Sequence, residues 1–191
     1  MTVLDIVKFP DELLRKKSKE IVDFDGSLKK FSEDMVETMY ASRGVGLAAV
    51  QVGALKRILV LDVTPFIDAD KENENEENSE ENSEEIPEKE SLKNPEIFVN
   101  PEIISFDGKT EFEEGCLSLP GVNGVVKRAG SVRVKYSNIQ GESFENSFSD
   151  YHAIVLQHEI DHLNGVLFFD HLGPLKRSLV LKKYEKLSED S

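Results

Sequence analysis

The sequence has 191 residues, of which 39% are hydrophobic, and a formal net charge of −14. This length allows one domain with a substantial core but not two of ordinary size. The acidic balance gives no support for nucleic-acid recognition, and a single cysteine excludes an internal disulfide and suits a reducing compartment. No apolar run approaches the roughly 20 residues of a membrane span, and MTVLDIVKFP lacks the features of a signal peptide. We therefore expect a single-domain cytoplasmic protein, residues 1–191, without membrane contact or specific nucleic-acid readout.

One segment, residues 68–91, carries most of the negative charge. It holds 12 acidic and 2 basic side chains, a net charge of −10, which leaves −4 for the rest of the chain. A stretch so poor in apolar residues cannot bury a core, so we expect a disordered surface loop. The acidity of the whole chain therefore says little about the partner of the folded part.

Helical periodicity appears first in residues 27–42, where apolar side chains form one stripe and Ser27 is the expected N-cap. The stripe consists of Leu28, Phe31, Met35 and Met39. Residues 56–63 (KRILVLDV) and 97–106 (IFVNPEIISF) have the aliphatic and β-branched character of strands. Several shorter strands, separated by Gly, Pro and Asn, are expected between residues 108 and 148.

A second helix is predicted for residues 150–164, with Gly165 as its C′ residue. Apolar residues lie on more than one side of it, which indicates a buried helix. A last helix begins near Pro174. Because strands and helices are segregated along the chain, the sequence predicts an α+β fold. We expect antiparallel sheets packed around the central helix, with further helices near the two termini.

The predicted central helix carries QHEIDH, residues 157–162. Helical spacing places His158 and His162 on one face, as two nitrogen ligands of one metal ion require, with Glu159 beside them as a proton acceptor. Asp161 lies between the two histidines in the sequence. It could accept a hydrogen bond from a metal-bound histidine, but we interpret it as a salt-bridge partner. A metal-binding module without turnover is the alternative to an enzyme.

The third ligand distinguishes the possible hydrolase classes. The metzincin pattern requires a histidine where this chain has Phe168, so that class is excluded. A thermolysin-like peptidase would use a later glutamate, for which Glu185 is the candidate. Cys116, the only thiol, would complete a Cys-His-His set with an open position for water. Glu159 would then take a proton from that water and pass it to a leaving amine.

Three segments together resemble the motifs of the peptide deformylase family. They are GVGLAAVQ (44–51), EGCLS (114–118) and QHEIDH (157–162), and they occur in the order of the family. The resemblance implies a metal-dependent hydrolase that removes the formyl group from the N-formylmethionine of nascent polypeptides and releases formate. Two departures are Val50, where the family often has proline, and the acidic segment, which has no counterpart in the usual pattern.

The resemblance also implies a role for individual residues. It implies Cys116, His158 and His162 as metal ligands, Glu159 as general base and then general acid, and Gln51 with the backbone N–H of Leu117 as donors to the formyl oxygen. Gly46 would offer its backbone to the passing peptide. By motif position, the methionine pocket would be lined by Val45, Phe112, Tyr151, Ile154 and Val155.

A thiolate with two imidazoles accepts Zn²⁺, Fe²⁺, Ni²⁺ or Co²⁺. The resemblance implies Fe²⁺ in the cell. It also implies nascent chains as substrates and a contact of the basic C-terminal helix with the ribosome.

Overall fold

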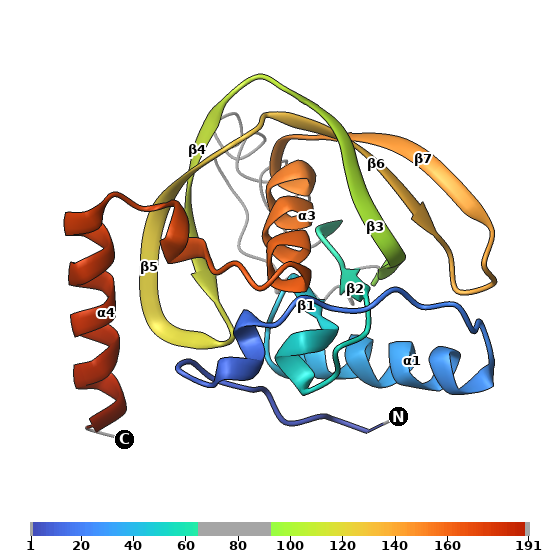
Figure 1. The fold of residues 1–191 in the computed structure, drawn as a ribbon, viewed down its shortest axis with the longest axis horizontal. Coiled ribbons are helices and arrows are strands. Elements are labelled where there is room, and N and C mark those ends of the chain that lie inside the picture. Colours follow the sequence, from blue (N-terminus) through green and yellow to red (C-terminus); the bar gives the residue numbers. More distant parts are fainter. Residues whose placement is uncertain (1, 65–92, 190–191) are drawn as a thin grey trace, which may run out of the picture.

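A computed structural model describes residues 2–64 and 93–189 and confirms the α+β class (Figure 1). Five strands form one antiparallel sheet in the order β1-β2-β3-β6-β7, and β4 and β5 form a separate hairpin. The strands are β1 (Gly46–Ala48), β2 (Ile58–Leu61), β3 (Glu96–Asp107), β4 (Thr110–Cys116), β5 (Leu119–Arg128), β6 (Ser131–Ser137) and β7 (Ser143–Ser149). The loop expected at residues 68–91 lies outside the described residues.

The central helix is α3 (Asp150–Leu163), which lies between the five-stranded sheet and the β4–β5 hairpin (Figure 1). Its buried residues include Ala153, Leu156 and Leu163, and they pack with side chains of β2, β3 and β6 in one core. The helix ends as predicted, with Asn164 as the C-cap and Gly165 at φ +75°. The structure therefore confirms a buried helix that carries the QHEIDH motif.

Strand β2 is buried on both faces, which explains its continuous aliphatic sequence. Leu59 and Leu61 face the core that includes α3, and Ile58 and Val60 face a second core beneath α1. The alternation of side chains along a strand produces this division. The arrangement holds β1, the neighbour of β2, at the middle of the molecule.

Helix α1 (Gly26–Ala41) covers the second core with the predicted apolar stripe. The prediction that Ser27 is the N-cap of this helix is wrong. Asp25 is the N-cap, and its Oδ1 accepts hydrogen bonds from the backbone nitrogens of Ser27 and Leu28, each at 3.0 Å. A carboxylate at this position satisfies free N–H groups and also interacts favourably with the positive end of the helix dipole.

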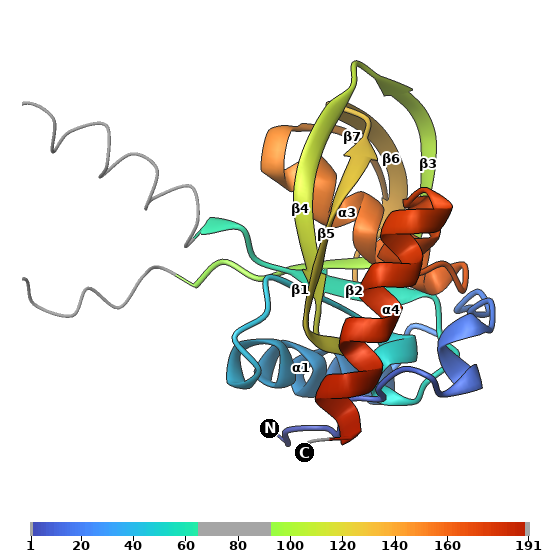
Figure 2. The same cartoon turned by 90° about the vertical axis from the view of Figure 1, so that its left-hand side faces the viewer.

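Helix α4 (Pro174–Glu189) lies along β5 on the outside of the molecule (Figure 2). The hydroxyl of its buried Tyr184 donates to the carbonyl of Phe9 at 2.7 Å, which ties the helix to the N-terminal segment. Three short 3₁₀ helices, η1 (Glu12–Arg15), η2 (Ala49–Val52) and η3 (Phe168–His171), complete the described elements. Among the described helices, none is both long enough and apolar enough to cross a bilayer.

Candidate functional site

Cys116, His158 and His162 come together in the centre of the molecule. Their ligand atoms all lie within 4.8 Å of one another, and no other group of three or more metal-ligating side chains was found among residues 2–64 and 93–189. Nε2 of His162 lies 3.2 Å from Sγ of Cys116 and 3.2 Å from Nε2 of His158. One soft sulfur and two imidazole nitrogens that converge in this way form a donor set suited to a divalent transition metal.

Two elements bring these ligands together. His158 and His162 are one helical turn apart on α3, as their spacing predicts. Cys116 ends β4, directly after a register shift between Gly115 and Cys116 in the β4–β5 hairpin. The ligand set therefore depends on how the hairpin is held against α3.

Glu114 lies behind His158. Its Oε2 is 2.8 Å from Nδ1 of His158, so the opposite ring nitrogen faces Cys116 and His162. Arg128 donates to both oxygens of the same carboxylate, at 2.7 and 2.9 Å. Burial raises the pKa of Glu114, but the hydrogen bonds from Arg128 and His158 outweigh it and lower the pKa to about 2. Glu114 is therefore an anion that orients a candidate ligand histidine.

Burial and the neighbouring His158 lower the pKa of His162 well below its ordinary value. The neutral imidazole that results is the form that binds a metal.

Glu159 is buried beside the ligands, with one side-chain oxygen, Oε2, that has no hydrogen-bond partner among the described residues. Burial raises the pKa of Glu159 to about 7. Gly46 on β1 makes room for this carboxylate, since a Cβ there would lie 2.6 Å from Oε1 of Glu159. A carboxyl group with an elevated pKa and a free oxygen is well suited to accept and return a proton.

The side-chain amide of Gln51 points toward Cys116. Its Oε1 accepts a hydrogen bond from the backbone N–H of Ala48 at 2.8 Å, which fixes the orientation of the amide. Its Nε2 lies 3.6 Å from Sγ of Cys116 and donates to Oγ of Ser118 at 3.3 Å. The NH₂ group is thus presented next to the candidate metal ligands.

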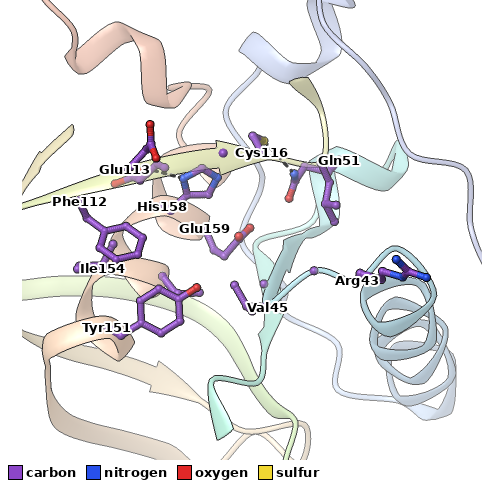
Figure 3. Close-up of a pocket in the computed structure, with 16 residues that line it drawn as sticks. Arg43, Val45, Gln51, Phe112, Glu113, Cys116, Tyr151, Ile154, His158 and Glu159 are labelled. Carbon is purple, nitrogen blue, oxygen red and sulfur yellow. Dashed lines mark hydrogen bonds and ion pairs between the residues drawn. The ribbon is translucent and has the colours of Figure 1, made fainter. Parts of the chain in front are cut away.

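A cavity of about 490 Å³ opens onto this cluster. Figure 3 shows Cys116, Gln51 and Glu159 on one side of it and the side chains of Phe112, Tyr151 and Ile154 on the other. The described lining comprises Arg43, Gly44, Val45, Gly46, Gln51, Phe112, Glu113, Glu114, Gly115, Cys116, Leu117, Tyr151, Ile154, Val155, His158 and Glu159. Its volume falls within the range of small-molecule sites, roughly 300–1,000 Å³.

The residues singled out from the sequence converge on this cavity. Of the proposed catalytic, metal-binding and pocket residues, all line it except His162, which is only 1% exposed. Glu185, the alternative third ligand, is exposed on α4 and is not part of the metal-ligating cluster. Asp161 forms an ion pair with Arg128, as the salt-bridge interpretation predicted, and its Oδ2 lies 2.7 Å from Nε2 of His171.

Sequence reasoning missed Glu114 and Arg128 as parts of the site. Glu114 stands two residues before Cys116, in a motif whose cysteine is the more conspicuous candidate. Arg128 is 14 residues further along the chain, at the far end of β5. The only sequence signal for Glu114 is an acidic residue two positions before a candidate ligand, and no local pattern marks Arg128.

Comparison with known proteins identifies close relatives. Residues 3–178 match the family model described as polypeptide deformylase. Peptide deformylases from Mesorhizobium japonicum and Brucella suis are 41% and 42% identical, over 100% and 98% of this chain and 96% and 95% of theirs. The crystal structure of a peptide deformylase from Legionella pneumophila superposes with a TM-score of 0.81 at 40% identity, covering 98% of this chain and 96% of that one. The peptide deformylase from Thermus thermophilus gives a TM-score of 0.79 at 33% identity over 100% of both chains.

Proposed function

This chain belongs to the polypeptide deformylase family, and we propose that it hydrolyses the formyl group from N-formylmethionyl peptides at the Cys116–His158–His162 cluster. The observation that carries the proposal is the position of Glu159. Its buried carboxylate lies in the same cavity as the three donors, beside the ligand histidine that precedes it in the chain. A hydrolytic site requires such a proton acceptor within reach of its water.

The donor set fits a catalytic metal. Cys116, His158 and His162 supply three ligand atoms, and a catalytic ion of this kind retains a further position for water. A divalent ion held there would act as a Lewis acid and lower the pKa of that water. Glu114 maintains the orientation of His158 by accepting a hydrogen bond from Nδ1.

Glu159 is proposed to move the proton. It accepts one from the attacking water and delivers it to the nitrogen of the departing peptide, so that formate and a free amino terminus result. Its burial supports this role, because a carboxyl group whose pKa lies near 7 both takes up and releases a proton readily at neutral pH. The absence of a Cβ at Gly46 leaves room for the carboxylate in this position.

Negative charge develops on the formyl oxygen during attack. The Nε2 donor of Gln51 and the backbone N–H of Leu117 are the proposed partners of that oxygen. Support comes from the amide of Gln51, which is oriented by Ala48 and lies next to Cys116, and from the position of Leu117 in the cavity wall. Donors that are fixed before the reaction need no reorganisation during it.

The methionine side chain is proposed to enter the apolar end of the cavity. The candidate lining residues are Val45, Phe112, Tyr151, Ile154 and Val155. Three of them, Tyr151, Ile154 and Val155, share one face of α3 with His158, so the same helix would carry the pocket and the metal ligand. The ring centroids of Phe112 and Tyr151 lie 5.3 Å apart, which joins β4 to α3 at the pocket.

Fe²⁺ is the proposed metal in the cell, with Zn²⁺, Ni²⁺ and Co²⁺ as functional substitutes. A cytoplasmic location and a contact of α4 with the ribosome also remain proposals. Basic side chains support the latter: Lys176, Arg177, Lys182, Lys183 and Lys186 all lie on α4 and are exposed.

Release of formate from formyl-Met-Ala-Ser tests the proposal, with protein loaded anaerobically with Fe²⁺ or with Ni²⁺. We expect release in both metal forms. Cys116→Ser should remove bound metal and activity together, whereas Glu185→Ala should retain both. The opposite pattern would support a thermolysin-like peptidase. Metal binding without release of formate in either form would indicate a binding module.

A further inference from the structure

Arg128 joins the two segments that carry the candidate metal ligands. It ends β5 and is buried, with a side chain only 4% exposed. Its Nε and Nη2 donate to the two oxygens of Glu114 at 2.7 and 2.9 Å, and its Nη1 lies 2.5 Å from Oδ2 of Asp161. Glu114 stands two residues before Cys116 on β4, and Asp161 directly precedes His162 on α3. One guanidinium therefore contacts a neighbour of Cys116 on β4 and a neighbour of His162 on α3.

The contact to Asp161 is reinforced at the protein surface. Nε2 of His171, in η3, lies 2.7 Å from the same Oδ2 of Asp161 and 3.4 Å from Nη1 of Arg128. The contact to Glu114 continues inward, since Oε2 of Glu114 also meets Nδ1 of His158 at 2.8 Å. The polar contacts thus run without interruption from η3 to a ligand histidine.

We infer that Arg128 is a positioning residue that holds the Cys116 segment and the histidine helix at the separation that metal binding requires. The inference rests on the proposed ligand set. Its physical basis is the geometry of a guanidinium, which presents several N–H donors in one rigid plane. The bidentate contact fixes Glu114, and the remaining nitrogen fixes Asp161, so that neither segment can shift without breaking a buried charged hydrogen bond.

Strand pairing does not hold the β4–β5 hairpin against α3. Strands β4 and β5 pair only with each other among the described strands, and the register shift beside Cys116 interrupts their ladder at the ligand itself. The strand ladders therefore do not connect Cys116 to α3. Among the described side chains, the charged contacts between the two segments run through Glu114 and Arg128.

Arg128→Lys tests the inference, because lysine keeps the charge but cannot make the planar bidentate contact. The probe is Co²⁺, whose affinity is measured by competition with a chelator and whose visible spectrum reports the thiolate ligand and the coordination geometry. We expect Arg128→Lys to weaken Co²⁺ binding by about tenfold or more and to change the spectrum. The free energy of unfolding of the metal-free variant is measured in parallel.

Arg57→Lys is the matched control. Arg57 also contacts the end of α3, through Asn164 Oδ1 at 2.9 Å, while its other nitrogen donates to the carbonyl of Pro101 at 2.8 Å. Asn164 follows His162 by two residues, but among the described residues neither its side chain nor the Pro101 carbonyl is hydrogen-bonded to the side chain of a candidate ligand. We expect Arg57→Lys to lower stability without changing Co²⁺ affinity or spectrum.

Several outcomes would overturn the inference. If folded Arg128→Lys binds Co²⁺ as tightly as the unaltered protein with the same spectrum, Arg128 has a structural role only. If Arg128→Lys does not fold, Asp161→Asn is used in its place, because it weakens the contact of Arg128 with α3 and leaves the ion pair of Arg128 with Glu114 intact. Unchanged Co²⁺ affinity in Asp161→Asn would count equally against the inference. If the unaltered protein shows no cobalt–thiolate band, the proposed ligand set itself fails, and the inference falls with it.

Discussion

Gly46 and Glu159 are in direct contact across the wall of the cavity. A Cβ at Gly46 would lie 2.6 Å from Oε1 and 2.8 Å from Cγ of Glu159. This glycine is therefore required by the side chain opposite it, in addition to any backbone contact that it makes with a peptide. The first motif and the third motif, 113 positions apart in the chain, meet at this point.

Gly46→Ala should displace the Glu159 carboxylate while leaving the metal ligands in place. Because a shift of about 1 Å in a reacting group can cost a hundredfold in rate, we expect kcat/KM for formyl-Met-Ala-Ser to fall by about that factor. Metal content should be unchanged. Gly173→Ala is the control, since a Cβ there meets nothing within 4 Å. Equal activity of the two variants would show that Glu159 tolerates the extra methyl group.

Glu159→Ala should retain the metal and lose the reaction. General acid–base catalysis typically contributes about 10²- to 10⁴-fold, so we expect kcat to fall at least by the lower figure. Metal analysis and formate release are measured on the same preparation. Glu113→Ala removes a different carboxylate from the same cavity, an exposed one, and should change kcat little. Substantial activity in Glu159→Ala would contradict its role as the general base.

The spacing within QHEIDH correctly predicted two histidines on one face of a helix, and the aliphatic run of β2 correctly predicted a strand. Both predictions depend only on the residue pattern within a single helix or strand. The choice of N-cap was wrong, because Ser27 and Asp25 are both capable caps and only the backbone decides which one precedes the first helical turn. Cys116 is accessible to sequence reasoning as the only thiol and through its motif. Arg128 could not be found at all, since its contacts with Glu114 and Asp161 depend on the β4–β5 register and on the packing of that hairpin against α3.

Gly165→Ala should destabilise the protein without changing the candidate active site, since Gly165 does not line the cavity. Gly165 has φ +75°, and a Cβ there would overlap the carbonyl group of Arg15. The left-handed conformation alone costs about 1–2 kcal/mol for a residue with a Cβ, and contact with backbone atoms adds to that cost. Urea unfolding should therefore show a loss of about 2 kcal/mol or more. Gly26→Ala, where a Cβ meets nothing within 4 Å, should be close to neutral.

Deleting residues 68–91 should leave folding and turnover nearly intact. The carboxylate of Asp62 accepts hydrogen bonds from the backbone N–H groups of Thr64, at 2.9 Å, and Asn94, at 2.8 Å. The chain on either side of the segment is thus held together, and a shorter connection costs little to close. The unfolding midpoint and formate release of the shortened chain provide the measurement. A large loss of either would show that the acidic segment contributes to the fold or to the reaction.

Asp62 should make stability depend on pH in acid. Burial raises the pKa of Asp62, but hydrogen bonds from the Tyr40 hydroxyl and from the backbone N–H groups of Asn94 and Thr64 outweigh it and lower the pKa below 3.8. A carboxyl group with a lowered folded-state pKa stabilises the protein above its unfolded-state value, and that contribution is lost as the pH falls below it. We compare the free energy of unfolding of the unaltered protein with that of Asp62→Asn. The difference should be greatest near neutral pH and should shrink below pH 3.8. A difference that stays constant through this range would show that the ionised form of Asp62 adds nothing to the hydrogen bonds it accepts.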